Sequence, residues 1–183
     1  MSIVAIISSP RGKGNTNTIV QAMVNGAKEN GKDVKIYNLN SLSNAKGCQA
    51  CMACKKAVGC AVKDDHAEIL KAIRDAEGLI ISTPTYFGEA CGQFRLLQDR
   101  FYSFIGPDFV PNIGGGKKLA TVVSCGGGAD GAKAMADKIE GAMVGMLKFV
   151  PVGKIVFTGA NPPDTASKDK TVLDEAKAIG KKF

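Results

Sequence analysis

Five short apolar segments alternate with amphipathic segments along this chain of 183 residues, and this alternation limits the fold more than any other feature. The apolar segments are rich in β-branched residues, as buried strands are, and cover residues 2–8, 33–38, 78–83, 118–124 and 152–158. Helical spacing of apolar residues predicts helices near 15–30, 65–73, 94–105, 132–148 and 171–181, with a linker at 161–170. Strands that alternate with helices form a parallel sheet with helices on both faces.

The number of strands predicts a flavodoxin-like α/β fold with strand order 2-1-3-4-5. We expect one domain over 1–183, with a cysteine-rich loop at about 45–63 after the second strand. Asn15 or Thr16 is predicted to cap the first helix, and Asp64 or Asp65 the second. In such a sheet the ligand binds outside the carboxyl ends of the strands, so the loops after the first, third and fourth strands are expected to meet.

Four cysteines lie within thirteen residues, at Cys48, Cys51, Cys54 and Cys60, with the spacing C-x2-C-x2-C-x5-C. Four thiolates are the usual ligand set of a [4Fe–4S] cluster, which gives each sulfur its own iron. A single zinc ion, usually held by two distant C-x2-C pairs, and a set of reduced or reactive thiols are the alternatives. No Asp or Glu occurs from 34 to 63, whereas five lysines do, and these would offset the negative charge of a cluster.

Three loops are expected to form a second site at the carboxyl edge of the sheet. The loop at 8–17 is rich in hydroxyl groups and opens a helix, whose first N–H groups suit a monophosphate such as that of FMN. The loop at 83–88 offers aromatic side chains and backbone amides to a flat ring, and the glycines of 124–131 allow close approach. The predicted FMN ligands are Ser9, Arg11, Gly14, Asn15, Thr16, Asn17, Pro84, Thr85, Tyr86, Phe87, Gly88, Ser124, Gly126, Gly127 and Gly128.

Composition argues against several classes of protein. The net charge is +7, but only 6% of residues are aromatic, Trp is absent and no nucleic-acid motif occurs, so nucleic acid is not an expected partner. The apolar run at 3–7 is too short for a signal peptide or a membrane span, and six cysteines without a signal peptide favour a reducing cytoplasm. His66, the only histidine, is expected to be structural.

Three stretches carry a family resemblance: SPRGKGNT at 9–16, KGC-x2-C-x2-C-x5-C…KDD at 46–65, and STPTYFG…DR at 82–100. Together they resemble the NADPH-dependent FMN reductase branch of the flavodoxin-like proteins, and the cysteine motif is similar to that of the iron–sulfur flavoproteins. The resemblance implies FMN and a [4Fe–4S] cluster in each subunit of a homodimer or homotetramer, with the cluster of one subunit near the flavin of another. It implies an oxidoreductase that takes electrons from a donor such as ferredoxin and passes them through cluster and FMN to oxygen, peroxide or a quinone-like acceptor.

Two other functions stay open at this point. One is a cluster-free reductase that uses NAD(P)H to reduce FMN, quinones, azo or nitro compounds. The other is a non-catalytic electron carrier or a zinc-stabilised flavin-binding module. No catalytic side chain is predicted in any of them, because the flavin carries the chemistry. Cys91 and Cys125, outside the motif, are expected to be small packing residues.

Overall fold

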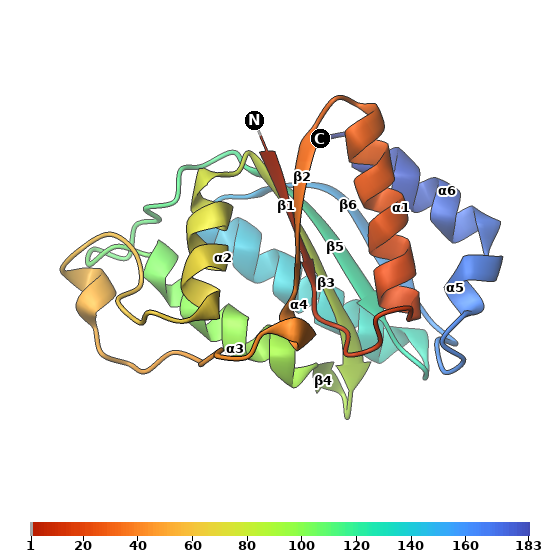
Figure 1. Ribbon diagram of the computed structural model, residues 1–183, viewed down its shortest axis with the longest axis horizontal. Coiled ribbons are helices and arrows are strands. Elements are labelled where there is room, and N and C mark those ends of the chain that lie inside the picture. Colours follow the sequence, from red (N-terminus) through yellow and green to blue (C-terminus); the bar gives the residue numbers. More distant parts are fainter. Residues whose placement is uncertain (1) are drawn as a thin grey trace.

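The computed structural model describes residues 2–183 and contains the predicted parallel sheet. Its strands lie in the order β2-β1-β3-β5-β6 (Figure 1), which is the predicted order 2-1-3-4-5 once the short strand β4 is set aside. All four pairings between these neighbours are parallel. The strands are β1 (Ser2–Ile7), β2 (Asp33–Asn38), β3 (Gly78–Tyr86), β5 (Lys118–Ser124) and β6 (Val150–Phe157).

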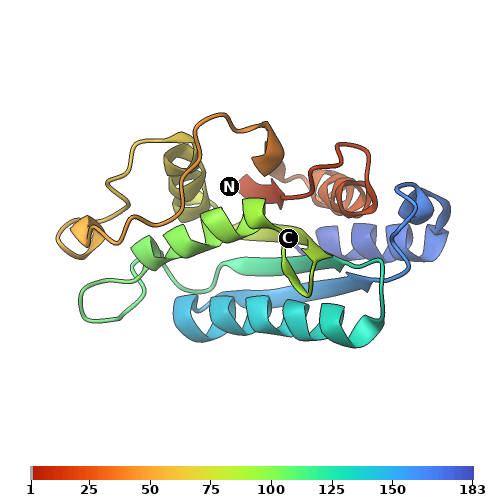
Figure 2. The same ribbon diagram turned by 90° about the horizontal axis from the view of Figure 1, so that it is seen from below.

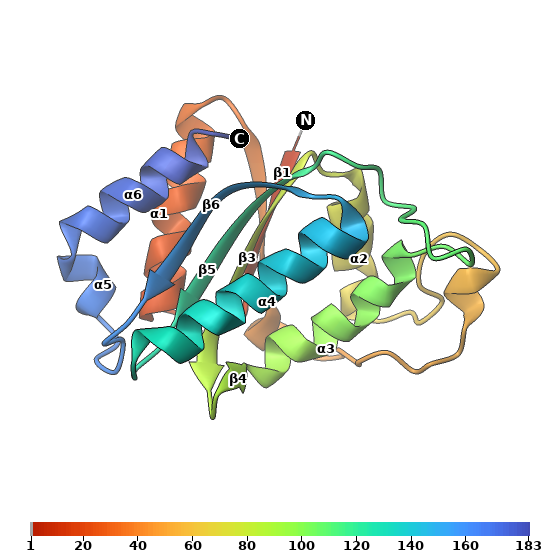
Figure 3. The same ribbon diagram turned by 180° about the vertical axis from the view of Figure 1, so that it is seen from behind.

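Helices cover both faces of the sheet because successive side chains of a strand point to opposite faces. In β1, Val4 and Ile6 belong to a buried cluster with α2 (Asp65–Asp75), α3 (Gly92–Arg100) and α4 (Ala129–Leu147). Ile3, Ala5 and Ile7 belong to a second cluster with α1 (Asn15–Glu29), α5 (Thr165–Lys168) and α6 (Lys170–Gly180). Figure 3 shows α4 lying across its face of the sheet.

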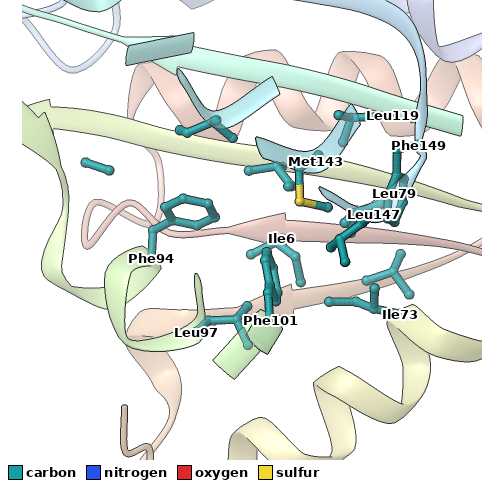
Figure 4. Close-up of a cluster of buried hydrophobic side chains, with 14 of the residues drawn as sticks. Ile6, Ile73, Leu79, Phe94, Leu97, Phe101, Leu119, Met143, Leu147 and Phe149 are labelled. Atoms are coloured by element: carbon teal, nitrogen blue, oxygen red, sulfur yellow. The ribbon is translucent and has the colours of Figure 1, made fainter. Parts of the chain in front are cut away.

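The hydrophobic cluster beneath α2, α3 and α4 contains side chains from the sheet and from all three helices. Figure 4 shows Ile6 and Leu79 of the sheet facing Phe94 and Leu97 of α3 and Met143 of α4. Four of these side chains are fully buried and Met143 is 3% exposed. This packing fixes α3 against the sheet, so that the residues at its two ends have defined positions.

The structure differs from the predicted elements in several places, of which four are the clearest. β3 continues to Tyr86 and turns back into β4 (Glu89–Ala90), forming an antiparallel hairpin that the sequence pattern did not predict. α3 ends at Arg100 and is followed by a 3₁₀ turn, Phe101–Phe104. A one-turn helix, α5, lies within the predicted linker, and α4 begins at Ala129, three residues before the predicted start.

The N-cap of α1 is Gly14, not Asn15 or Thr16 as predicted, whereas Asp64 caps α2 as expected by accepting a hydrogen bond from the N–H of Ala67. Asn15 is the first residue of α1, and its side chain has another function. The amide donates to the carbonyls of Ala160 and Pro162 and accepts from the N–H of Ala166. Asn15 therefore ties the start of α1 to the segment after β6.

The cysteine segment leaves the sheet after β2 and lies at the opposite side of the molecule from α1 and α6 (Figures 1 and 2). It passes through two short 3₁₀ turns, Leu39–Ser41 and Ala53–Lys55, before it reaches α2. In the described part of the chain, no helix is long and apolar enough to span a membrane.

Candidate functional site

A cavity of about 120 Å³ opens at the carboxyl edge of the sheet, where the three predicted loops meet. Thr16 and Ser124, from the first and third loops, are buried here, and their hydroxyl oxygens lie 2.6 Å apart. A fourth loop, after β6, completes the wall. The lining residues are Ser9, Arg11, Gly14, Asn15, Thr16, Pro84, Thr85, Tyr86, Ser124, Cys125, Gly126, Ala160 and Asn161.

The start of α1 gives this cavity the character of an anion site. The first hydrogen bond of the helix runs from the N–H of Thr18 to the carbonyl of Gly14. In the described structure, the N–H groups of Asn15, Thr16 and Asn17 therefore have no acceptor within the chain, as at any helix start. With the helix dipole behind them and Arg11 beside them, they suit a phosphate group, and none of the lining residues is acidic.

Ala160 and Asn161 were not among the predicted site residues. The N–H of Ala160 donates to the carbonyl of Cys125 over 3.0 Å, which holds the loop after β6 against the glycine loop. The Asn161 amide donates to the carbonyl of Gly126 over 3.3 Å, and Arg11 donates to the carbonyl of Asn161 over 3.3 Å. The sequence position of this loop, directly after the last strand, could have indicated it as part of the site, because the parallel strands β5 and β6 end at the same edge of the sheet.

The loop after β3 presents Thr85 and Tyr86 to the cavity. The hydroxyl of Thr85 is buried and has no partner among the described residues, so it is free to bond to a ligand. Tyr86 is half exposed beside it. A flat, hydrogen-bonding ligand such as a flavin ring would satisfy both groups.

Five predicted ligands lie outside the lining of the cavity. Phe87 is at the tip of the β3–β4 hairpin, fully exposed and with a left-handed φ of 51°, and Gly88 follows it with φ 81°. The Asn17 side chain donates to the carbonyl of Gly12, away from the cavity. Gly127 and Gly128 lead into α4 without lining the cavity.

A second cavity, of about 20 Å³, brings the four motif cysteines together. Cys48, Cys51, Cys54 and Cys60 all line it. No three His, Cys, Asp or Glu side chains in residues 2–183 are placed to hold a single metal ion. The four thiols around this cavity match the number of protein ligands that an iron–sulfur cluster takes.

The backbone beside these cysteines is shaped for an anionic group. Ala50 and Met52 have left-handed φ values of 50° and 58°, although neither is glycine. Met52 has a left-handed backbone conformation and is followed by the right-handed 3₁₀ turn Ala53–Lys55. Such a change of handedness points successive N–H groups into one concavity. In the described structure, the N–H groups from Cys51 to Cys54 have no acceptor within the chain.

Arg100, at the end of α3, closes one wall of this second cavity. Its side chain is fully buried and its Nε lies 3.2 Å from Cys60 Sγ. Its Nη1 donates over 2.9 Å to a carboxylate oxygen of Asp64, whose side chain is 1% exposed. Burial alone would raise the pKa of Asp64, but hydrogen bonds from Arg100 and from the N–H of Lys46 outweigh burial and hold that pKa below its usual value.

The two cavities share no residue and lie at opposite ends of α3. Cys91, before the first residue of α3, donates its N–H to the carbonyl of Pro84 in the first cavity. Arg100, the last residue, reaches the cysteines. A helix of this length spans about 13 Å at 1.5 Å per residue, so one rigid element sets the separation of the two sites.

His66, Cys91 and Cys125, the other residues considered in the sequence, differ in their surroundings. His66 is buried, with Nδ1 3.1 Å from the carbonyl of Lys46, as expected for a structural histidine. Cys91 is buried as predicted, and its Sγ lies 3.3 Å from the carbonyl of Ser8. Cys125 is half buried and lines the first cavity, so it is less enclosed than predicted.

The sequence is similar to one protein family and to several iron–sulfur flavoproteins. The NADPH-dependent FMN reductase family model matches residues 1–163. Two iron–sulfur flavoproteins of Methanocaldococcus jannaschii are 27% and 32% identical, and the alignments cover 100% and 93% of this chain and 95% and 84% of theirs. An iron–sulfur flavoprotein of Archaeoglobus fulgidus is 30% identical over 100% of this chain and 94% of its own.

Solved structures confirm the fold. An NAD(P)H:quinone oxidoreductase from Methanothermobacter marburgensis superposes with a TM-score of 0.77 at 16% identity, covering 99% of this chain and 96% of its own. An archaeal flavodoxin gives 0.61 at 17% identity, with 100% and 95% covered. These two structures show the fold alone, whereas the family model and the full-length relatives show that the chain belongs to the NADPH-dependent FMN reductase family and, within it, to the iron–sulfur flavoproteins.

Proposed function

We propose that this protein is a two-cofactor electron-transfer oxidoreductase, in which a [4Fe–4S] cluster takes single electrons from a protein donor such as ferredoxin and FMN delivers them to oxygen, peroxide or a quinone-like compound. The observation that carries the proposal is that all four motif cysteines line one cavity. A thiol set of this size, in a chain of this family, supplies every protein ligand that such a cluster requires.

The cavity at the carboxyl edge of the sheet supports FMN as the second cofactor. The free N–H groups at the start of α1, with Arg11, are suited to hold the phosphate, and the unpartnered hydroxyl of Thr85 is suited to bond to the ring. Gly126 also lines the cavity, and its lack of a side chain leaves room for Asn161, since a Cβ on Gly126 would come within 1.9 Å of Asn161 Oδ1. In this proposal these residues bind and orient the flavin, and the cofactor performs the chemistry.

Positive charge near the cysteines supports an acidic protein as donor. Lys46, Lys56 and Lys63 are exposed. Lys55 is not available to a partner in the same way, because its ammonium donates to the carbonyls of Tyr102 and Ile105 over 2.9 and 2.5 Å. Complementary charge speeds association and makes it dependent on salt, so neutralising the three exposed lysines is expected to slow reduction by ferredoxin most at low ionic strength.

The test is the content of iron, acid-labile sulfide, zinc and FMN in protein purified without oxygen. We expect about four irons and four sulfides with one FMN per chain. Cys51→Ala is expected to lose the iron and keep most of the FMN, because Cys51 does not line the FMN cavity. Cys125→Ser is the matched control: it also removes a thiol, but one outside the cysteine cavity, so its iron is expected to stay.

Other compositions would point to the alternative functions. FMN without iron, even after anaerobic reconstitution, combined with rapid flavin reduction by NAD(P)H, would identify a cluster-free reductase. Zinc in place of iron would identify a zinc-stabilised flavin-binding module. Full iron and sulfide in Cys51→Ala would show that the cysteine assignment is wrong.

A further inference from the structure

We propose that Arg100 and Ser103 form a donor wall for the cluster, in which Arg100 positions Cys60 and both residues raise the midpoint potential at which the cluster is reduced. This inference rests on the proposed function, because it needs a cluster bound to the four cysteines. The two residues are three positions apart at the junction of α3 and the 3₁₀ turn that follows it, a spacing that places side chains on one side of a helix.

Arg100 is held in one orientation by contacts on every side. Nη1 donates to Asp64 and to the carbonyl of Lys46, both over 2.9 Å, and Nη2 donates to the carbonyl of Val62 over 3.1 Å. The remaining edge of the guanidinium, at Nε, faces Cys60 Sγ at 3.2 Å. Because the planar fork is fixed by three other acceptors, its Nε–H keeps its direction toward the sulfur.

The contacts of Arg100 also fix the backbone around the last cysteine of the motif. Lys46 and Val62 lie on the two sides of the cysteine segment, and Asp64 caps α2 directly after it. One side chain therefore joins the start and the end of the segment that carries all four thiols. Arg100 acts on the cluster through Cys60, as a positioning residue.

Ser103 provides an independent observation. It is 3% exposed and lines the cysteine cavity, and its hydroxyl oxygen has no hydrogen-bond partner in the described structure. Buried hydroxyl groups almost always have a partner, since leaving one unpaired destabilises the fold. A sulfur acceptor in the cavity, either a cysteine thiolate or a cluster sulfide, would satisfy the Ser103 hydroxyl.

Donors to sulfur change the redox equilibrium in a predictable direction. Reduction adds one negative charge to a group that is already negative, and N–H or O–H donors stabilise the added charge. Removal of such a donor therefore makes the reduced form less favourable and lowers the midpoint potential. The ammonium of Lys55 is bonded to backbone carbonyls, so it does not substitute for the donor wall.

The experiment is a potentiometric titration of the anaerobic holoprotein with dithionite and redox mediators, followed by visible absorbance and low-temperature EPR. The variants are Arg100→Gln/Asp64→Asn, Ser103→Ala and Ser103→Thr. The double substitution removes the whole ion pair, so no unpaired charge is left buried. Arg95→Gln is the matched control, because it makes the same change on α3 at an exposed arginine that does not line the cysteine cavity.

We expect the Arg100→Gln/Asp64→Asn protein to show about a tenfold lower ratio of reduced to oxidised cluster at a given potential, which is about 59 mV for one electron. Ser103→Ala is expected to shift the ratio in the same direction by a smaller factor, and Ser103→Thr, which keeps the hydroxyl, is expected to restore it. Arg95→Gln is expected to stay within about twofold of the wild type, because exposed charges are screened. A residue with only a structural role would change the unfolding midpoint without moving the potential.

The outcomes separate this inference from the proposed function. A wild-type protein without iron and sulfide overturns the proposed function, and the inference with it. Variants that hold four irons and four sulfides but titrate within twofold of the wild type overturn the inference alone. If the double substitution prevents folding or sheds iron, Ser103→Ala decides: an unchanged potential in that loaded variant overturns the tuning role, and a lowered potential that Ser103→Thr restores supports it.

Discussion

Gly126→Ala tests whether the loop after β6 is part of the FMN site. A Cβ on Gly126 would lie 1.9 Å from Asn161 Oδ1 and 2.6 Å from Asn161 Cγ, which is far inside van der Waals contact. The Asn161 side chain must swing away, and its hydrogen bond to the carbonyl of Gly126 is lost. The bond from Arg11 to the carbonyl of Asn161 is expected to weaken as the loop moves.

The size of the effect follows from these two bonds. Each is long and exposed, and a typical intramolecular hydrogen bond contributes about 1 kcal/mol net. The expected loss is about 1–2 kcal/mol in the binding free energy of FMN, or roughly 5- to 30-fold weaker binding. The assay is quenching of flavin fluorescence when FMN is titrated into FMN-free protein. Gly127→Ala is the control, because its Cβ would meet nothing closer than Cys125 Sγ at 3.8 Å.

A double-mutant cycle with Asn161→Ala identifies the cause. Asn161→Ala removes the side chain that a Cβ on Gly126 would strike, so Gly126→Ala is expected to cost little further affinity in that background. The reasoning is refuted if Gly126→Ala weakens FMN binding equally with and without the Asn161 side chain. It is also refuted if Gly127→Ala weakens binding as much as Gly126→Ala.

Two further predictions concern stability. Asp64→Asn leaves Arg100 buried without its counter-ion, so urea unfolding of cofactor-free protein at pH 7 is expected to show a loss of about 3–5 kcal/mol. Because folding lowers the pKa of Asp64, its ionised form stabilises the wild type above about pH 4. The difference in unfolding free energy between the wild type and Asp64→Asn is expected to shrink as the pH falls below that value. A constant difference down to about pH 3 would contradict the ion pair with Arg100 as its cause. Gly26→Ala would place a Cβ 2.1 Å from the backbone oxygen of Lys177 in α6. We expect the free energy of unfolding to fall by about 1–3 kcal/mol and the melting temperature, measured by calorimetry, to fall by about 2–12 °C. Gly141→Ala is the control: its Cβ would meet nothing within 4 Å, so it is expected to be neutral or stabilising.

Much of the fold could be predicted from local patterns. Runs of β-branched residues in alternation with helical periodicity fix a parallel sheet, and the strand order follows from the few topologies that such a sheet allows. Asp64 was expected as a helix cap because capping depends on residues three positions apart. The hairpin after Tyr86 was not expected, because its turn places Phe87 in a left-handed conformation that favours glycine and asparagine.

The sequence indicated the location of both candidate sites but not the contacts of every residue in them. The spacing of the cysteines, by itself, indicated a cluster, since the motif is compact and its chemistry depends on residue type. The loops at the strand ends were also identifiable, because parallel strands end at one edge of the sheet. Within these loops, the role of each side chain depends on distant contacts. Asn15, predicted to bind FMN, lines the cavity, but its side chain is hydrogen-bonded to residues about 150 positions later, which the sequence did not indicate.

Only the tertiary structure decided what surrounds each site. Arg100 reaches Cys60 from 40 positions away, and Asn161 meets Gly126 from 35 positions away. Such contacts depend on how α3 and the loop after β6 are held against the rest of the molecule, and no local period or turn signal encodes that arrangement. The sequence by itself therefore determined the topology, the compact set of four cysteines and the edge of the sheet where the candidate FMN loops meet, because each depends on short-range pattern and residue chemistry. Three-dimensional packing determined which buried donors lie beside the cysteines.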